Sequence, residues 1–492
     1  CSADPKCSAA VGADGVLNPF SAFGGITQDE LAYLMANSLK DNYQTKMTMA
    51  TFVVDGEFGK LPGGAIGWAV GLDTRSESAR IRPDEFSAGG LTTGGALDPL
   101  QGSYNVNEVY GEVRLPLIAD APFVQSFDIT ASTRYSDYNT GAGSQDTYKV
   151  GFDWAINDQI RARAVYSTGF RAPNMVEYFT QAVTFPQSEN YCEFTSLRND
   201  ISAVAKTNCT ALGYDGLYEQ GGEWQSTYSQ TAAGGDDLGP EDSETWTAGV
   251  VLTPHFVEGL ELSFDWFNIQ IDDYIGLPDY NFLVKTCLES INFSAPACAA
   301  FPSGTGILDA NNGVADNAAT SLGNLGSVES AGADVAARYT HDVEWGPISM
   351  VNAGIEAAYL DKAEKSFPLT GSYSLEGTAG EGGVAVYPEW RYNATFGVGG
   401  ESWNVTWTVR YIDESVDLYR PASITDDATA EEVYYNDIAA TYTYDAYSVI
   451  VGVDNVADEE PPLFHSGFNM DTAPGYYDSL GRRMFMSVKM SL

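Results

Sequence analysis

The sequence lacks any long apolar run. A transmembrane helix needs about 18 or more consecutive, mostly apolar residues, and no window of this chain of 492 residues contains them. Apolar residues make up 44% of the chain, but they are spread along it rather than gathered into a few segments. We therefore exclude a helical membrane protein.

Basic residues are scarce. The chain has 25 Lys and Arg against 67 Asp and Glu, which gives a formal net charge of −42 at pH 7. A nucleic-acid-binding protein needs a basic surface that neutralises phosphate groups, so this charge argues against DNA or RNA as a partner. We interpret the excess of carboxylates as a solvated acidic surface.

Sequence motifs of enzyme active sites are also missing. The chain contains no nucleophile elbow, no His-Glu-x-x-His sequence and no phosphate-binding loop, and its three histidines, His255, His341 and His465, are scattered. We predict that the protein is not an enzyme and has no cofactor. The segment from Asp309 to Asp316 offers several oxygen ligands, so calcium bound to this loop is an alternative, although the complete calcium-loop spacing and its closing Glu are absent.

The six cysteines do not form the doubled Cys-x-x-Cys pattern of a zinc site. They fall into pairs that are close in sequence within polar segments, which predicts disulfides that staple loops in an oxidising compartment. Other pairings are open, and a lipid on Cys1 is an alternative for that residue. The preferred pairs are Cys1 with Cys7, Cys192 with Cys209, and Cys287 with Cys298.

What the chain has in abundance is an alternation of apolar and polar residues. From Trp403 to Tyr411 every odd position is a large apolar or aromatic residue and every even position is polar, and the alternation returns in the final segment up to Leu492. A period of two predicts a β-strand with one face in an apolar medium and the other in a wet one. We count roughly 15 such strands, starting near Lys46.

The connections between these strands alternate in length. The turn from Ile156 to Gln159 is short, whereas residues 169–239 and 276–324 form long loops. Short turns at one end and long loops at the other are typical of outer-membrane barrels, and aromatic residues at strand ends favour the two membrane interfaces. These aromatic residues are Trp68, Tyr135, Tyr166, Trp403, Tyr411 and Tyr442.

We therefore predict an all-β fold, a transmembrane antiparallel β-barrel over residues 46–492, preceded by an extracellular loop with a short helix in residues 1–45. The alternation slips by one residue near Trp266 and Phe267. A slip of one residue exchanges the two faces of a strand, which predicts either a β-bulge at this point or the exit of the strand from the membrane.

Several segments go beyond a generic barrel pattern. They are Tyr-Ser-Thr-Gly-Phe-Arg-Ala-Pro-Asn-Met-Val-Glu-Tyr-Phe at 166–179, Glu-Asp-Ser-Glu-Thr-Trp at 241–246, Val-Asp-Asn-Val-Ala-Asp-Glu-Glu-Pro-Pro at 453–462 and the final strand at 481–492. Together they resemble the strand-closing and terminal motifs of TonB-dependent outer-membrane receptors. Members of that family usually end in an aromatic residue, whereas this chain ends in Leu492.

The resemblance implies a barrel of 22 strands whose lumen is plugged. Residues 46–492 would then supply roughly 15 of these strands, and the plug domain and its TonB box would lie outside this chain. It also implies TonB-dependent uptake of a scarce nutrient, an oligosaccharide, a peptide or a metal chelate, across the outer membrane of a Gram-negative bacterium. The implied partners are outer-membrane lipid and lipopolysaccharide, TonB acting through the plug domain, and the nutrient; a surface lipoprotein is a further candidate.

The long loop at 191–230 contains candidate ligand-binding residues. Its aromatic side chains lie among Gly, Gln and Asn, a mixture suited to stacking on and hydrogen bonding with sugars or peptides; the alternative is that they pack the loop on itself. They are Tyr214, Tyr218, Trp224 and Tyr228. Two other functions remain open: a passive porin-type channel of about 16 strands, and an adhesion barrel that transports nothing.

Overall fold

The computed structural model describes most of the chain. The described residues are 39–89, 97–179, 183–186, 202–212, 229–233, 235, 238–276, 280–304, 307–309, 314–315, 318–367, 371–381, 385–418, 429–464 and 471–491. No helix in these ranges is long and apolar enough to cross a membrane.

The main element is one large antiparallel sheet whose long strands follow each other in chain order. Its first strands are β1 (Asn42–Leu61), β2 (Gly64–Arg82), β3 (Leu100–Ala121), β4 (Val124–Tyr138), β5 (Ser144–Asn157), β6 (Ile160–Arg171), β9 (Glu241–Leu252) and β10 (Leu260–Gly276). It continues through β14 (Gly323–Trp345), β15 (Ile348–Phe367), β19 (Trp390–Gly399), β20 (Trp403–Ile412), β23 (Val433–Tyr444), β24 (Tyr447–Asp454) and β25 (Arg483–Met490). A short strand, β16 (Gly371–Ser374), pairs only with β15.

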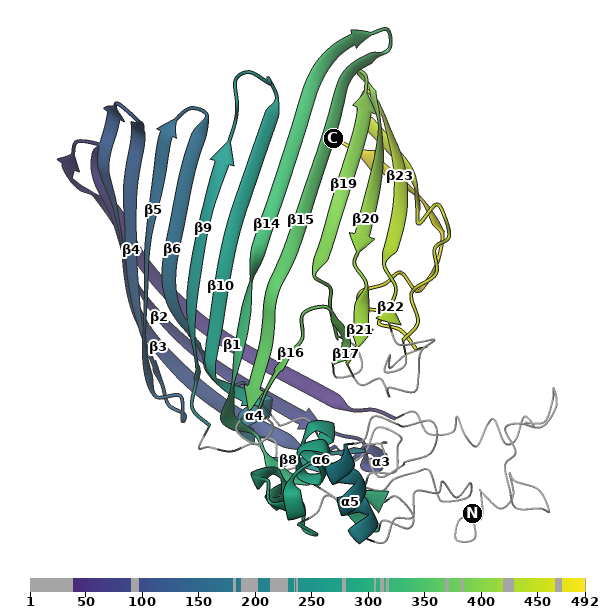
Figure 1. The fold of residues 1–492 in the computed structure, drawn as a ribbon. Helices are drawn as coiled ribbons and strands as arrows, with labels where there is room; N and C mark the ends of the chain where they lie inside the picture. The colour runs from purple at the N-terminus through teal and green to yellow at the C-terminus, as the bar shows by residue number, and fades with distance from the viewer. Residues whose placement is uncertain are drawn as a thin grey trace.

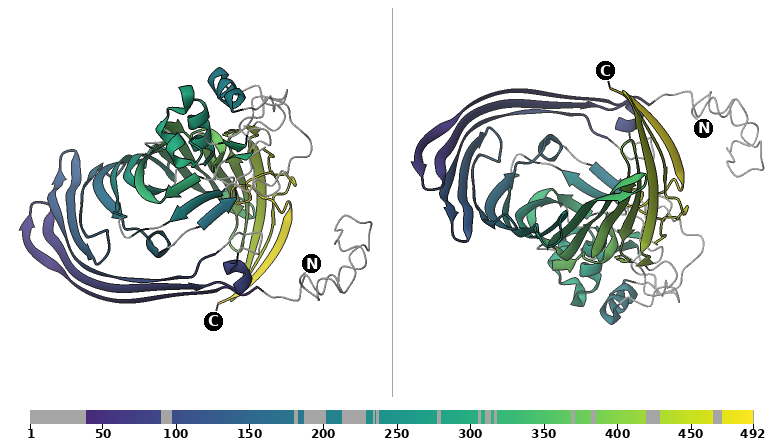
Figure 2. Two further views of the ribbon diagram at one scale, coloured as in Figure 1. Left: turned by 90° about the horizontal axis from the view of Figure 1, so that it is seen from below. Right: turned by 90° about the horizontal axis from the view of Figure 1, so that it is seen from above.

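The sheet curls into a barrel wall around an open interior (Figures 1 and 2). Each strand pairs with its neighbours in the sequence order, so the wall is a meander from β1 to β25. Within the described ranges no ladder joins β1 to β25. The predicted antiparallel barrel architecture is confirmed, and the described path of β1 to β25 agrees with the expected number of strands.

Short turns and long connections lie at opposite ends of the wall, as the sequence predicts. At one end, Leu61 is followed by β2 from Gly64, Asn157 by β6 from Ile160, and Tyr444 by β24 from Tyr447. The other end carries all the helices that Figure 1 labels. By the barrel convention, the turn end is periplasmic and the opposite end is extracellular.

The extracellular connections contain their own small elements. The helices are α3 (Glu85–Ala88), α4 (Met175–Phe179), α5 (Ala203–Ala211), α6 (Tyr280–Leu288), η1 (Ile291–Phe293) and η2 (Pro296–Ala300). Three small sheets are also present: β7 (Val183–Pro186), β8 (Ser229–Ala233) and β13 (Ala318–Ser321); β11 (Ile307–Asp309) and β12 (Val314–Ala315); and β17 (Thr378–Glu381), β18 (Ala385–Tyr387), β21 (Ser415–Asp417) and β22 (Thr429–Ala430).

Strand β10 excludes one of the two explanations that the sequence offered for its slip. Its pairing with β9 is continuous from Leu262 to Asp272, so there is no β-bulge at Trp266 and Phe267. The register shift lies further out, between Ile271 and Tyr274 in the pairing with β14. Of the two predicted explanations, the structure excludes the β-bulge at this point, and the exit of the strand from the membrane stays a prediction.

The buried residues lie mainly in the extracellular connections rather than in the wall. One cluster is built from α5, α6 and η2, a second joins the β17–β22 sheet to residues of the wall, and a third contains Tyr178, Leu238 and Ile275. We call residues 202–212 and 280–304 the helical cap. We call the β17, β18, β21 and β22 sheet, together with residues 455–464 and 471–481, the sheet cap.

Candidate functional site: the interior face and its caps

The outward face of the wall carries aromatic rings in two bands. Near the extracellular end, the rings of Tyr392, Tyr411 and Tyr434 on three neighbouring strands follow each other at 4.7 Å between centroids. Near the periplasmic end, Trp403 pairs in register with Tyr442. Amphipathic rings favour the two interfaces of a bilayer, so these bands mark the height of the membrane.

The interior face carries ion pairs between side chains of different strands, three of them on adjacent strands and one across an intervening strand. These pairs satisfy charges that would otherwise lie unpaired along the wall, and all four arginine side chains remain more than half exposed. The pairs are Arg114 with Asp128 at 2.6 Å, Arg161 with Asp153 at 2.7 Å, Arg163 with Asp265 at 2.8 Å, and Arg338 with Glu356.

One of these pairs depends on a glycine. Arg163 on β6 and Asp265 on β10 are separated by the intervening strand β9, and they meet through two hydrogen bonds of 2.9 and 2.8 Å. The residue of β9 between them is Gly249, where an added Cβ would lie 1.9 Å from the Asp265 Oδ1. Only glycine leaves the space that this carboxylate occupies.

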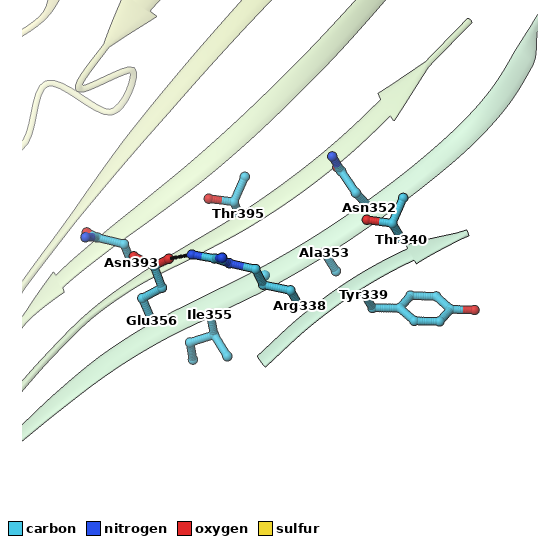
Figure 3. Close-up of a pocket in the computed structure, with 10 residues that line it drawn as sticks. Arg338, Tyr339, Thr340, Asn352, Ala353, Ile355, Glu356, Asn393 and Thr395 are labelled. Carbon is cyan, nitrogen blue, oxygen red and sulfur yellow. Dashed lines mark hydrogen bonds and ion pairs between the residues drawn. The ribbon is translucent and has the colours of Figure 1, made fainter. Parts of the chain in front are cut away.

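A hollow of about 310 Å³ opens on the interior face of β14, β15 and β19 (Figure 3). Its lining includes Arg338, Asn352, Glu356, Asn393 and Thr395. These positions alternate along their strands with residues whose side chains face outward. The hollow lies close to the periplasmic end, since Asn352 is four residues into β15, which starts at Ile348.

The motif at 166–179 forms a junction between the wall and its extracellular connections. Arg171, at the end of β6, donates to both carboxylate oxygens of Glu241 at 2.6 and 2.7 Å, and also to Glu177 at 2.9 Å. Glu241 is only 5% exposed and also accepts a hydrogen bond from the Ile275 backbone at 2.8 Å. Arg171 therefore neutralises a buried carboxylate that links β6, β9 and the end of β10.

The rest of the motif turns the chain into α4. The Asn174 side chain caps this helix by accepting from the backbone N–H groups of Val176 and Glu177 at 2.8 and 3.0 Å. The capped helix buries Tyr178, whose hydroxyl accepts from the Ala142 backbone at 3.0 Å. The sequence motif is thus a structural connector, and it does not line the hollow.

The helical cap joins two loops that are distant in sequence. Asn208 on α5 is buried, and its amide donates to the backbone oxygens of Leu288 at 2.8 Å and Ser290 at 2.7 Å. Cys287 and Cys298 form a disulfide within the same cap. These contacts tie the connection after β6 to the connection after β10.

The sheet cap is tied to the wall by Arg410 on β20. The guanidinium of Arg410 donates to Asp437 on β23 at 2.8 Å and to Asp478 in the cap. It also lies 4.8 Å from the ring centre of Tyr435, whose hydroxyl accepts from the Asp478 backbone at 3.1 Å. One arginine on β20 therefore holds a carboxylate and an aromatic ring of β23 together with a carboxylate of the sheet cap.

Tyr477, beside this network, is 2% exposed, and its hydroxyl has no hydrogen-bond partner among the residues that the structure describes. Burial raises the pKa of Tyr477, and the neighbouring phenols of Tyr435 and Tyr476 raise the pKa further. A neutral hydroxyl without a partner in a buried site is a cost to the folded state.

Several predicted site residues lie outside the described part of the chain. They are the four aromatic candidates, Tyr214, Tyr218, Trp224 and Tyr228, together with Cys1, Cys7 and Cys192. Cys209 is disulfide-bonded, but its partner lies outside the described residues, so the pairing with Cys192 remains a prediction.

The predicted calcium loop also falls largely outside the described residues. In the described ranges, no group of three or more His, Cys, Asp and Glu residues is placed to hold a metal ion. The histidines that are described have ordinary surroundings: His255 lies 3.2 Å from Asp158 at a turn, and the His341 ring stacks on Tyr339.

Sequence reasoning missed the hollow and the Arg410 network. The residues of the hollow meet only through the register of β14, β15 and β19, and those of the Arg410 network only where β20 and β23 meet the sheet cap. The sequence gives no short motif for either. The lone arginine in the alternating strand at 403–411 was the one available signal for the network, because a cation on an interior face needs a partner.

The family described as TonB dependent receptor-like, beta-barrel, matches residues 13–456 of the chain. The fold is similar to that of a mutant ferric enterobactin receptor, PfeA, from Pseudomonas aeruginosa in complex with enterobactin, with 15% identity, a TM-score of 0.57 and coverage of 92% of this chain and 55% of that one. No curated protein matches the chain.

Two further solved structures have similar folds. The siderophore receptor PirA from Acinetobacter baumannii has 15% identity and a TM-score of 0.56, with coverage of 93% of this chain and 56% of that one. The FrpB iron transporter from Neisseria meningitidis has 13% identity and a TM-score of 0.51, with coverage of 91% and 55%. The chain spans about half the length of these receptors.

A curled antiparallel wall with an aromatic-banded outward face and a polar interior defines an outer-membrane β-barrel protein of a Gram-negative bacterium. Within this class, the chain belongs to the TonB dependent receptor-like, beta-barrel family. The resemblance of its motifs to that family is therefore confirmed.

Proposed function

We propose that this chain is the wall and loop region of a receptor that takes up a scarce nutrient across the outer membrane, energised by TonB. The observation that carries this proposal is the family match over residues 13–456. The arrangement of the wall supports it, because the caps gather at the extracellular end, where a nutrient would first be met. TonB would act through a plug domain outside this chain.

The nutrient class is an oligosaccharide, a peptide or a metal chelate. The similar structures are named for ferric enterobactin, siderophores and iron, but at their low sequence identity they carry no substrate over to this chain. The arginines of the ion pairs described above each have a carboxylate partner. These paired cations offer little attraction to a strongly anionic chelate.

The outward face would contact outer-membrane lipid and lipopolysaccharide, and the caps would be the surface available to the nutrient or to a surface lipoprotein. No group in the interior is proposed to do covalent chemistry. The loops at 191–230, with Tyr214, Tyr218, Trp224 and Tyr228, remain candidates for the first contact with the nutrient.

The test is uptake of labelled oligosaccharide, peptide and ferric siderophore pools by cells that produce the complete receptor. We expect accumulation of one pool that stops when TonB is deleted or the proton-motive force is collapsed. Uptake that persists without energy would indicate a passive channel, and no uptake despite ligand binding would indicate an adhesion barrel. Either result would overturn the proposal.

A further inference from the structure

The outward face of β1, β2 and β3 changes from apolar to polar toward its extracellular end. Leu72 of β2 lies on this face and pairs in register with Phe52 of β1, and both side chains are more than half exposed. Because side chains alternate between the two faces of a strand, the regular register here identifies the other outward residues. Every outward residue is polar from Thr48 to the start of β1, from Thr74 to the end of β2 and from Asn107 to the start of β3, and none of them is a carboxylate.

Three cations lie on this polar face. They are Lys46 on β1 and Arg80 and Arg82 on β2, and we call them the cationic patch. Lys46 lies opposite Ser78 and Arg80 lies opposite Gln44, so these two cations are diagonal neighbours, and Arg82 is the next outward residue of β2. Neighbours of this kind are about 7 Å apart. All three residues are exposed, and none forms an ion pair with another residue that the structure describes.

The carboxylates that flank the patch in the sequence bind other groups. Glu77 on β2 faces the interior, where it pairs with Arg75 at 2.7 Å. At the strand ends, Asp41 accepts from the backbone N–H of Asp84 at 2.8 Å, and Asp84 itself accepts from two backbone N–H groups at 3.3 and 3.0 Å. These groups leave the three cations without a counter-ion, and like charges held close together cost free energy unless an anion binds between them.

Another part of the outward face has the opposite charge beyond its apolar residues. On β9 the outward residues that follow Trp246 toward the extracellular end are Glu244 and Asp242. On β15 the outward Lys362 is paired with Glu329 of β14 at 2.6 Å. The chain as a whole has 67 acidic residues against 25 basic ones. A group of unpaired cations without a carboxylate is therefore a local feature of β1 and β2 and not the general character of this surface.

The patch lies on the membrane side of the wall, at the extracellular ends of β1 and β2. A plug domain in the lumen would not cover it, and a further strand beside β1 would extend the sheet in its own plane and leave this face open. Beyond the apolar part of an outer-membrane barrel, outward side chains meet the headgroups of the outer leaflet. The lipid of that leaflet is lipopolysaccharide, whose headgroup is a phosphorylated sugar.

The chemistry of the patch matches such a headgroup. Lys and Arg form charge-assisted hydrogen bonds with phosphate oxygens, and clusters of these residues beside a membrane attract anionic lipids. The amide of Gln44 and the hydroxyl of Ser78 lie opposite the two diagonal cations in the register, and uncharged polar groups of this kind suit the hydroxyls of a sugar. The patch thus combines donors for phosphate with donors and acceptors for the sugar that carries it.

We propose that the cationic patch binds the phosphate groups of a lipopolysaccharide molecule in the outer leaflet. Lys46 and Arg80 bind one phosphate group between them, Arg82 adds a third positive charge, and Gln44 and Ser78 contact adjacent sugar hydroxyls. This inference goes beyond the proposed uptake function and does not depend on it, because it requires only that the wall lies in the outer membrane.

The test uses the complete receptor, refolded from urea into detergent micelles so that it carries no bacterial lipid, with bound lipid counted by native mass spectrometry. The probes are a rough lipopolysaccharide, the same lipopolysaccharide after removal of its phosphate groups, and inorganic phosphate as a competitor. The variants are Lys46→Gln, Arg80→Gln, the two together, and the charge-conserving Arg80→Lys. The control is Lys60→Gln, which removes the same charge from the periplasmic end of β1. Circular dichroism and thermal melting check that each variant is folded.

The loss of one cation beside an anionic membrane surface weakens lipid binding about fivefold. We therefore expect about fivefold weaker binding of the intact lipopolysaccharide for each single variant to Gln and more than tenfold for the double variant. Arg80→Lys and Lys60→Gln should change it less than about twofold, and the form without phosphate should bind the wild-type receptor as weakly as the intact form binds the double variant.

The proposal is overturned if the folded double variant binds the intact lipopolysaccharide like the wild type, which would leave the patch to an acidic protein partner. It is also overturned if the form without phosphate binds as well as the intact one, or if Lys60→Gln weakens binding as much as Lys46→Gln. Displacement of the lipid by millimolar inorganic phosphate would overturn it in favour of a site for the free anion. None of these outcomes depends on whether uptake needs TonB.

Discussion

The wall and the caps of this protein are stabilised in different ways. In the wall, strands that are neighbours in sequence pair through hydrogen-bond ladders, and large side chains such as Phe52 and Trp407 remain 64% and 45% exposed because they face the membrane. In the caps, buried side chains from distant loops form compact cores. The strands of the wall thus depend on the alternation of apolar and polar residues along each strand, whereas a cap depends on particular side chains from distant segments that pack together.

The largest effect is expected where the two regions meet. Replacing Arg171 by Met leaves the buried Glu241 carboxylate without its cation, which should lower the free energy of unfolding by about 3 to 4 kcal/mol. Urea unfolding of the receptor refolded in lipid vesicles measures this loss. The matched control is Arg338→Met in the exposed interior pair, which should have no measurable effect on stability; equal losses would contradict the distinction between junction and wall.

In the wall, the face of a residue should decide the cost of a charge. Trp407→Lys places an amine on the membrane face of β20 and should cost about 2 to 4 kcal/mol, whereas Thr406→Lys, one residue earlier on the interior face, should cost much less. Refolding into lipid vesicles with urea titration compares the two variants. Equal penalties would show that the faces are assigned wrongly.

In the helical cap, the disulfide should stabilise the cap without affecting the wall. The double variant Cys287→Ser with Cys298→Ser opens a short covalent loop, which should cost the cap about 2 to 3 kcal/mol of local stability. Hydrogen exchange followed by mass spectrometry should then increase in α5 and α6 and stay unchanged in β19 and β20. Faster exchange in the wall would mean that the two regions unfold together.

In the sheet cap, Arg410 should act as the tie to the wall. Arg410→Met leaves Asp437 and Asp478 without their shared cation and should cost the cap about 2 kcal/mol. Faster hydrogen exchange is expected in residues 471–481, with the helical cap unchanged. Arg483→Met, which removes an exposed pair with Asp454 on the neighbouring strands, serves as the control.

The smallest effect is expected at Tyr477. Because its hydroxyl is buried without a partner among the described residues, Tyr477→Phe removes an unsatisfied group and should raise the free energy of unfolding by about 1 kcal/mol at pH 7. The raised pKa of the folded state means that the unfolded chain loses its proton first, so the wild-type sheet cap should lose stability as the pH rises above about 10, the ordinary value for tyrosine. Tyr477→Phe should weaken this alkaline loss; an identical pH profile for the two proteins would contradict the buried position of the hydroxyl.

Much of the wall could be predicted from the sequence. The strand from Trp403 to Ile412 has the predicted alternation and pairs in regular register with both neighbours, and the turn at Asn157 connects β5 to β6. Strand β10 was harder, because a β-bulge and the exit of a strand from the apolar band predict the same slip, and only the continuous pairing of β10 with β9 excludes the bulge. The alternation shows which face of a strand is apolar and which is polar. It does not show at which residue the strand leaves the membrane.

The sequence by itself determined the all-β barrel, its direction and its family, because these follow from spacing within single strands and from local motifs such as 166–179. Only the tertiary structure decided the caps, the hollow and the ion pairs between strands. Asn208 meets Leu288 80 residues away, Arg410 meets Asp478 68 residues away, and Arg163 meets Asp265 102 residues away across Gly249. Such contacts depend on how strands and loops that are distant in sequence are placed in the fold, which no local pattern of residues specifies.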